Sequence, residues 1–77
     1  MKYKTKEYSI EYKIKTKSQE IIFSFDTFEA PKAQAIIEYY KKWRESLVEN
    51  YIFDIHFIEN GKDITKKINK VLEIKAR

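Results

Sequence analysis

The feature that most constrains the fold of this chain is a long amphipathic stretch from Ala30 to Glu49. Apolar side chains recur there at the three- and four-residue spacing of an α-helix, and charged side chains occupy the opposite side. The predicted apolar stripe consists of Ala33, Ile36, Ile37, Tyr40, Trp43 and Leu47. A helix cannot bury such a stripe alone, so the segments before and after it must supply the rest of the core.

The ends of this helix carry recognisable signals. Thr27 is a capping residue and Pro31 suits a first turn, so the helix is predicted to begin between them. Asn50 is predicted to end it in a left-handed conformation. At the centre of the stripe, Trp43 is expected to pack on three aromatic residues of a sheet: Tyr12, Phe23 and Phe53.

Two segments before the helix, 7–15 and 20–28, alternate apolar and polar residues as half-buried strands do. A tight turn at Lys17-Ser18 between them would pair residues whose numbers sum to 35. That register places the apolar residues of both strands on the face that meets the helix. The other face is then predicted to carry no aromatic side chain.

The segment 51–59 alternates in the same way, with Phe53, Ile55 and Phe57 predicted on the core face. Asn60-Gly61 is a typical type I′ hairpin dipeptide. A short strand near 62–65 and a helix to about Lys75 are predicted to follow. A longer strand over 66–75 is the alternative, and it would turn Lys66 inward.

The order β-β-α-β-β-α predicts an α+β fold in a single domain, residues 1–77. It is a small antiparallel sheet of three to four strands with one long helix packed on one face and a short C-terminal helix. If the third strand pairs with the first, the spatial order is 2-1-3-4 and all neighbours are antiparallel.

Composition narrows the function classes. The chain has 77 residues, no cysteine and one glycine, so a disulfide framework, a thiolate metal site and a glycine-rich phosphate loop are excluded. Its net charge of +4 divides into +4 for residues 1–17, −4 for 18–61 and +4 for 62–77. Such a pattern is typical of solvated basic ends and leaves polyanion binding open.

The side chains that could carry chemistry are few. Ser24, Asp26, Asp54 and His56 are predicted to share one sheet face, which invites comparison with a nucleophile and its base. An open face offers no pocket that excludes water, and one histidine with scattered carboxylates lacks metal-ligand spacing. We therefore expect no enzyme activity, no metal and no cofactor.

The favoured function is a small non-enzymatic binding module that docks on another protein. Lysine- and isoleucine-rich composition resembles that of phage or mobile-element accessory proteins, which suggests a host protein or a protein–nucleic-acid complex as the target and inhibition as one outcome. A homodimer is a further alternative. The candidate protein interface consists of Tyr39, Arg44, Ile22, Ile52 and Ile58.

The second candidate function is nucleic-acid binding through the lysine-rich ends. The candidate contacts are Lys66, Lys67, Lys70, Lys75 and Arg77, joined by Lys2, Lys4 and Lys6. No apolar run is long enough to span a membrane and no secretory signal pattern opens the chain, so the expected setting is cytoplasmic, without a membrane partner.

Overall fold

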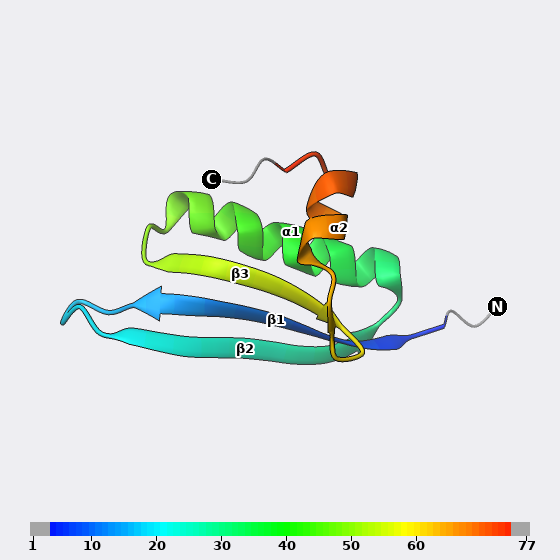
Figure 1. Cartoon of the computed structure of the whole chain (residues 1–77), viewed down its shortest axis with the longest axis horizontal. Coiled ribbons are helices and arrows are strands. Elements are labelled where there is room, and N and C mark those ends of the chain that lie inside the picture. The colour runs from blue at the N-terminus through cyan, green and yellow to red at the C-terminus, as the bar shows by residue number, and fades with distance from the viewer. Residues whose placement is uncertain (1–3, 75–77) are drawn as a thin grey trace.

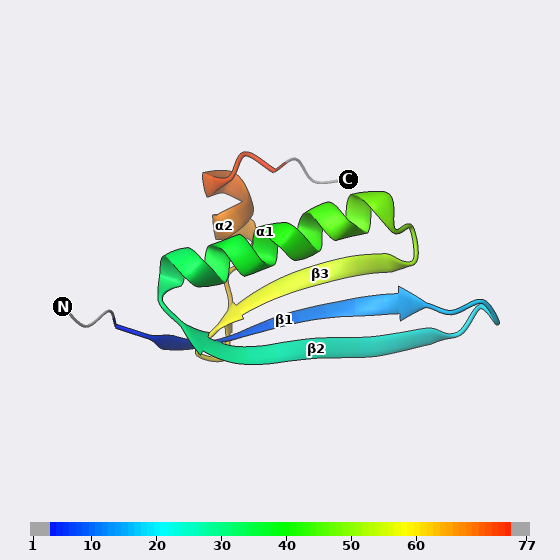
Figure 2. The same cartoon turned by 180° about the vertical axis from the view of Figure 1, so that it is seen from behind.

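In the computed structural model of the protein, residues 4–74 are described, and they form a four-stranded antiparallel sheet with two helices on one face (Figures 1 and 2). The predicted α+β class is confirmed, and the spatial order is β2-β1-β3-β4, the order expected if the third strand pairs with the first. The elements are β1 (Lys6–Lys15), β2 (Ile21–Ala30), α1 (Lys32–Val48), β3 (Ile52–Glu59), β4 (Lys62–Asp63) and α2 (Thr65–Val71).

The loop between β1 and β2 has three residues and not the predicted two. The N–H of Thr16 donates to the carbonyl of Glu20, and Gln19 between them has a φ of 69°. This is a type I turn followed by a left-handed residue, a common three-residue hairpin loop. Lys17 and Ser18 avoid the positive φ values that a two-residue type I′ turn would impose on both of them.

The extra loop residue moves the pairing of β1 with β2 by one position. Paired residue numbers sum to 36, so Tyr12 lies opposite Ser24 and Lys13 lies opposite Phe23. Cross-strand partners share a face, and a one-residue shift exchanges the faces of a whole strand. The odd-numbered residues of β2, including Phe25, therefore lie on the sheet face away from α1, which we call the open face. The prediction that this face lacks aromatic residues is wrong.

A β-bulge in β3 changes the facing of the residues before it. The register with β1 shifts at this point, and Asp54 has a φ of 56°. Ile52 pairs with Ile14 and is buried, whereas Phe53 pairs with Lys13 on the open face. Strict alternation predicted the reverse, because a bulge inserts one residue without any signal in the apolar pattern.

α1 begins and ends close to the predicted positions but buries a different face. Pro31 caps it at the N-terminus, and Glu49 at the other end stays extended, so the left-handed stop predicted for Asn50 is wrong. The buried residues of α1 are Ala35, Tyr39 and Ser46, and three members of the predicted stripe are 38–48% exposed: Ile37, Tyr40 and Leu47.

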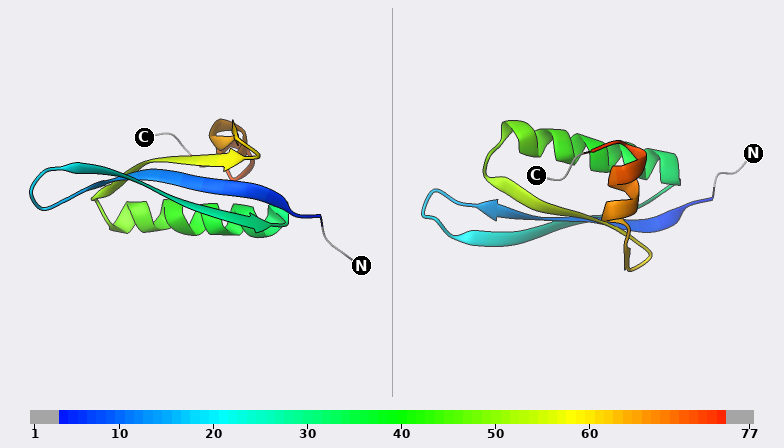
Figure 3. Two further views of the ribbon diagram at one scale, coloured as in Figure 1. Left: turned by 90° about the horizontal axis from the view of Figure 1, so that it is seen from below. Right: turned by 45° about the horizontal axis from the view of Figure 1, so that its top comes forward.

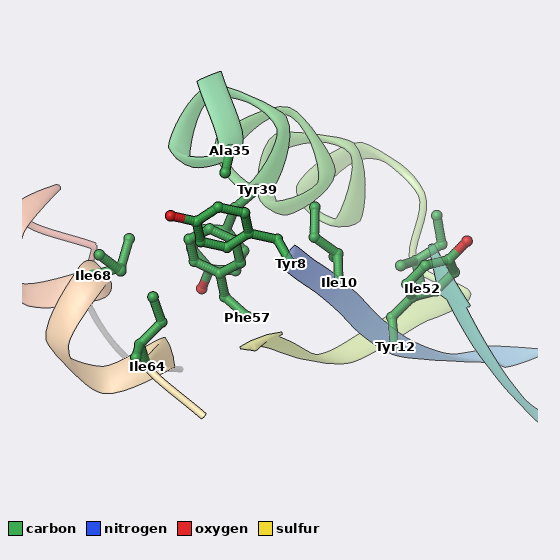
Figure 4. Close-up of a cluster of buried hydrophobic side chains, with 9 residues drawn as sticks. All are labelled: Tyr8, Ile10, Tyr12, Ala35, Tyr39, Ile52, Phe57, Ile64 and Ile68. Atoms are coloured by element: carbon green, nitrogen blue, oxygen red, sulfur yellow. The ribbon is translucent and has the colours of Figure 1, made fainter. Parts of the chain in front are cut away.

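Three stacked aromatic rings explain this rotation of α1 (Figure 4). The ring of Phe57 on β3 lies 4.9 Å from that of Tyr39 and 5.4 Å from that of Tyr8, and both pairs are stacked. The Tyr39 hydroxyl donates to Asn69 of α2. Tyr39 therefore joins α1 both to the sheet and to α2. Trp43 is outside this cluster, is half-buried and lies beside Tyr40, so its predicted place against Phe23 is wrong.

The C-terminal helix completes the core from the same side as α1. Ile64 and Ile68 pack into the cluster around Phe57, and the N–H of Ile64 donates to the carbonyl of Phe57. Asn60 and Gly61 have φ values of 47° and 82°, as expected for the type I′ turn that leads into β4. The predicted short strand and terminal helix are confirmed, but the helix ends at Val71 and not near Lys75.

The molecule is elongated, with extents of 49 × 24 × 19 Å. The β1–β2 hairpin extends past the end of α1, which gives the sheet one projecting end (Figures 1 and 3). Within residues 4–74, neither helix has the length and apolar character that a membrane crossing requires.

Candidate functional site

β2 is an outer strand whose backbone is half unpaired. On β1, even-numbered residues bond toward β2 and odd-numbered residues bond toward β3: Thr16 donates to Glu20, and Lys15 donates to Tyr51. Because antiparallel partners exchange hydrogen bonds at every second pair, only the even-numbered residues of β2 bond to β1. The backbone N–H and C=O groups of five residues point outward: Ile21, Phe23, Phe25, Thr27 and Glu29.

In the described part of the chain, this edge has only part of the usual protection against strand pairing: it carries the charges of Asp26 and Glu29, but no other element pairs with it. Natural edge strands carry lysine, proline, a bulge or a covering element. Ile21–Ala30 contains neither lysine nor proline, and its pairing with β1 runs without a register shift. A regular ten-residue edge is therefore available to another extended chain.

Three large apolar side chains lie along this edge on the open face, and we call them the edge patch: Ile21, Phe23 and Phe25. They are 60%, 57% and 59% exposed, and the two phenylalanine rings lie 6.1 Å apart. A single exposed apolar residue is ordinary, but a contiguous row along an open edge is typical of an interaction site.

Charged side chains of β1 flank the edge patch. Lys15 lies opposite Ile21, Lys13 opposite Phe23 and Glu11 opposite Phe25. The ammonium of Lys13 lies 2.9 Å from a carboxylate oxygen of Asp54. The patch is therefore bounded by charges of both signs.

On its other face, β2 borders a groove beneath α1. α1 lies over β3 and β1, and on the helix-facing side of β2 Ile22 and Asp26 stay exposed while Phe28 and Ala30 pack toward the core. The opening measures about 580 Å³, and we call it the acidic groove because its charged lining residues are four carboxylates and two lysines. They are Asp26, Glu29, Glu38, Glu45, Lys41 and Lys42.

The two lysines of the acidic groove are already paired within α1. Lys41 lies 3.6 Å from Glu38, and Lys42 lies 3.3 Å from Glu45 and 4.4 Å from the centre of the Tyr12 ring. Burial alone would lower the pKa of Lys42, but Tyr12, Glu45 and Asp26 outweigh it and raise that pKa. The groove is therefore a negative environment that stabilises a cation.

His56 occupies the open face between two carboxylates. Its Nδ1 lies 2.9 Å from Asp63 and its Nε2 lies 3.0 Å from Asp54. Burial lowers the pKa of His56, but the hydrogen bonds to Asp63 and Asp54 outweigh it and raise that pKa. Asp63 also accepts hydrogen bonds from the N–H and hydroxyl of Thr65. This arrangement ties the bulge of β3 to the start of α2.

The side chains grouped in the sequence as a nucleophile and its base are not together. Ser24 and Asp26 are even-numbered residues of β2 and face the α1 side, because they pair with Tyr12 and Ile10. His56 pairs with Glu11 on the open face. The predicted sharing of one face is wrong, and the one-residue shift of the hairpin is the reason.

The five predicted interface residues lie in three different environments. Tyr39 and Ile52 are 1% and 5% exposed in the core, so neither contributes to an exposed patch. Ile22 is half exposed on the helix-facing side of β2, Ile58 is half-buried on the open face, and Arg44 is exposed on α1.

The predicted nucleic-acid contacts are spread along α2. Lys66, Lys67 and Lys70 are exposed there, and Lys75 and Arg77 lie outside the described residues. A second hollow of about 490 Å³ beside them is lined by Lys62, Lys66 and Lys67 together with Glu59, Asp63 and His56. Its mixed charges do not favour a phosphate over a cation.

Sequence reasoning missed the edge patch and the acidic groove. The loop between β1 and β2 is the signal that could have revealed the patch. With three loop residues, paired residue numbers sum to 36, and this register places Ile21, Phe23 and Phe25 on the open face. Compared with protein-family models, curated proteins and solved structures, the chain matches none.

Proposed function

We propose that this protein is a binding module that takes up an extended segment of another protein as a fifth strand along β2. The observation that carries the proposal is the unpaired edge of β2, with outward backbone groups beside three exposed apolar side chains. Strand addition of this kind draws its affinity from backbone hydrogen bonds and its specificity from alternate side chains. The lack of catalysis and the phage or mobile-element setting stay predictions.

The energetics favour such a complex. Covering an exposed phenylalanine or isoleucine stabilises by roughly 1.5–3 kcal/mol when the side chain becomes fully buried. The edge patch offers three such residues, and the outward groups of β2 offer a row of hydrogen bonds. Ordering a flexible segment costs about 2–5 kcal/mol of that gain, so an affinity in the micromolar range is expected.

A proline substitution can remove one outward hydrogen bond without touching the edge patch. Thr27 is exposed, its N–H points outward, and it is not a patch residue. Proline is tolerated on an edge strand where its missing N–H would have faced solvent. Thr27→Pro should therefore fold and block strand addition, and Thr27→Ala is the matched control that keeps the N–H.

The experiment selects binders from a random peptide library on the immobilised chain and measures their affinity for both variants. Peptides that bind the native chain and Thr27→Ala should bind Thr27→Pro roughly tenfold or more weakly, the loss of about one well-formed hydrogen bond with its neighbours. Circular dichroism confirms that both variants are folded. Selected peptides that bind both variants equally would contradict strand addition at β2.

Nucleic-acid binding on the open face is a second candidate. The observation that favours it is that Phe23, Phe25 and Phe53 lie on the face that carries Lys13 and Lys15. Single-stranded nucleic acids stack bases on exposed aromatic rings of a sheet and place phosphates on neighbouring lysines. Lys13 is paired with Asp54, which weakens this candidate relative to strand addition.

The anisotropy of fluorescent oligo(dT) and oligo(U) at two salt concentrations tests the second candidate. Binding through the open face should weaken steeply with salt and be lost in a Phe23→Ala/Phe25→Ala variant. Binding through α2 should be lost when Lys66, Lys67 and Lys70 are changed to Glu. We expect only non-specific binding, at about 10⁻⁴–10⁻⁶ M. Tight, salt-steep binding that Thr27→Pro retains would favour nucleic acid over a protein strand.

A further inference from the structure

We infer that the strand taken up by β2 belongs to another protein and alternates basic with apolar residues, with lysine or arginine side chains in the acidic groove and apolar side chains on the edge patch. This inference rests on the proposed function and adds the chemistry of the partner. It follows from the different character of the two sides of β2.

An added strand would place its side chains alternately on the two sides of the sheet. Those directed to the open face would meet Phe23 and Phe25 of the edge patch. Those directed to the other side would enter the space between β2 and α1, where Glu38 and Glu45 line the acidic groove. The edge patch lies along Ile21–Phe25, and the β2 lining of the acidic groove runs from Asp26 to Ala30. Near the middle of β2, neighbouring residues of the partner would therefore meet different environments.

The length of the acidic groove sets the number of basic residues. On α1 it is lined from Gln34 to Glu45, which are eleven positions apart, or about 16 Å along the helix axis. Same-side residues of a strand are about 7 Å apart, so two or three fit along this length. Asp26, Glu38 and Glu45 line the groove on the helix side, with Glu29 at its border, and Lys41 and Lys42 pair with Glu38 and Glu45, so the formal charge of the lining is negative. Added cations would therefore meet net negative charge.

Charge also argues against a second copy of this chain as the occupant. β2 itself contains Asp26 and Glu29 and no basic residue. Pairing β2 with the β2 of another copy would bring these carboxylates to an edge that already carries the same ones. Like charges across a strand pair are destabilising. A homodimer through β2 is thus disfavoured relative to a basic partner strand.

The test uses three synthetic eight-residue peptides: alternating Lys-Val, alternating Glu-Val, and a block peptide of four lysines followed by four valines. Binding is measured by calorimetry, and the site is read from amide hydrogen exchange at Phe23 and Phe25. The Lys-Val peptide should protect both amides and bind roughly tenfold or more tightly than either other peptide, because two to three favourable ion pairs replace repulsions.

A pair of charge variants locates the effect in the groove. Glu38→Gln/Glu45→Gln should reduce the preference for Lys-Val over Glu-Val to less than about threefold. Glu7→Gln/Glu73→Gln changes the net charge equally outside the groove and should leave the preference intact.

The outcomes separate the inference from the proposed function. If Glu-Val protects Phe23 and Phe25 as well as or better than Lys-Val, strand addition stands and the basic partner is wrong. If the preference for Lys-Val survives in Glu38→Gln/Glu45→Gln, the groove does not select the partner, and the inference is again overturned. If neither alternating peptide protects the two amides, the proposed function fails and the inference fails with it.

Discussion

The stack of Tyr8, Phe57 and Tyr39 is the most important contact between individual residues in this fold. All three are at most 1% exposed, and the stack links β1, β3 and α1. Burial and the hydrogen bond that the Tyr8 hydroxyl donates to Glu59 raise the pKa of Tyr8 to about 12, so the hydroxyl remains protonated in ordinary buffers. A small domain of this kind has little stability in excess of what such a cluster supplies.

Truncation of Phe57 should be far more costly than truncation of Phe25. Phe57→Ala removes a fully buried ring and should destabilise by roughly 3–5 kcal/mol, enough to unfold much of the population. Phe25→Ala removes a ring that is 59% exposed and should cost less than about 1 kcal/mol. Urea unfolding followed by far-ultraviolet circular dichroism measures both. Equal costs would contradict the described register of the hairpin.

His56 should make the stability depend on pH in a particular direction. Its folded pKa is raised by Asp63 and Asp54 above the unfolded value near 6.5. The stabilisation that protonated His56 gives to the folded state is therefore complete below the unfolded pKa. It is lost as the pH rises through the folded pKa. Unfolding free energies should fall as the pH rises from about 6.5 through the raised folded pKa of His56.

The control for this prediction is His56→Gln, which removes the only histidine of the chain. The decline between acidic and weakly alkaline pH should flatten in this variant. A decline that persists unchanged would show that another group causes it.

Single residues also explain why the buried face of α1 escaped prediction. Tyr39 and Tyr40 are adjacent tyrosines, and Tyr39 is the one that is buried, stacked on Phe57 of β3 and bonded to Asn69 of α2. The remaining residues of the buried side include Ser46 and the largely buried side chain of Lys42, which no apolar pattern detects. Periodicity located the helix but could not choose between neighbouring phases.

At the scale of elements, one residue in a loop decides the faces of a whole strand. The loop before β2 contains Gln19 with a φ of 69°, a conformation that glycine adopts without strain. Gln19→Gly should therefore stabilise the protein by about 0.5–1 kcal/mol. With the two-residue turn predicted from sequence, position 19 would lie in a strand, and glycine would destabilise by a similar amount.

The sign of this change is measured by thermal unfolding, with Gln19→Ala as the control. Alanine gives no relief of the left-handed backbone, so it should not stabilise. A loss of stability with glycine would contradict the three-residue loop and the facing of Phe23 and Phe25 that depends on it.

The same elements show what the sequence can and cannot specify. The helix positions, the Asn60-Gly61 turn and the number of strands follow from periodicity and turn chemistry, and these predictions are confirmed. The bulge at Asp54 and the longer loop at Gln19 each add one residue out of phase. The alternating apolar pattern of the sequence does not reveal the bulge or the longer loop, because residues alternate in the same way on both sides of each irregularity.

At the scale of the whole molecule, the strand order makes β2 an outer strand, while α1 and α2 lie over the inner strands. The order β2-β1-β3-β4, which follows if the third strand pairs with the first, is sufficient to identify that edge. The strand order does not determine which side chains of β2 are exposed along that edge. The register predicted from the sequence placed Phe23 and Phe25 under the helix, whereas they lie on the open face. The candidate site was therefore missed through one wrong register, although the fold around it was predicted.

β2 exposes the backbone N–H and C=O groups of its odd-numbered residues, and amide hydrogen exchange of the free protein can detect this exposure. Exchange measured by NMR should be slow at Ser24 and Asp26, which bond to β1, and fast at Phe23 and Phe25, which face solvent. Slow exchange at Phe23 and Phe25 with fast exchange at Ser24 and Asp26 would contradict the described register. Slow exchange at all four would show that the edge is already covered.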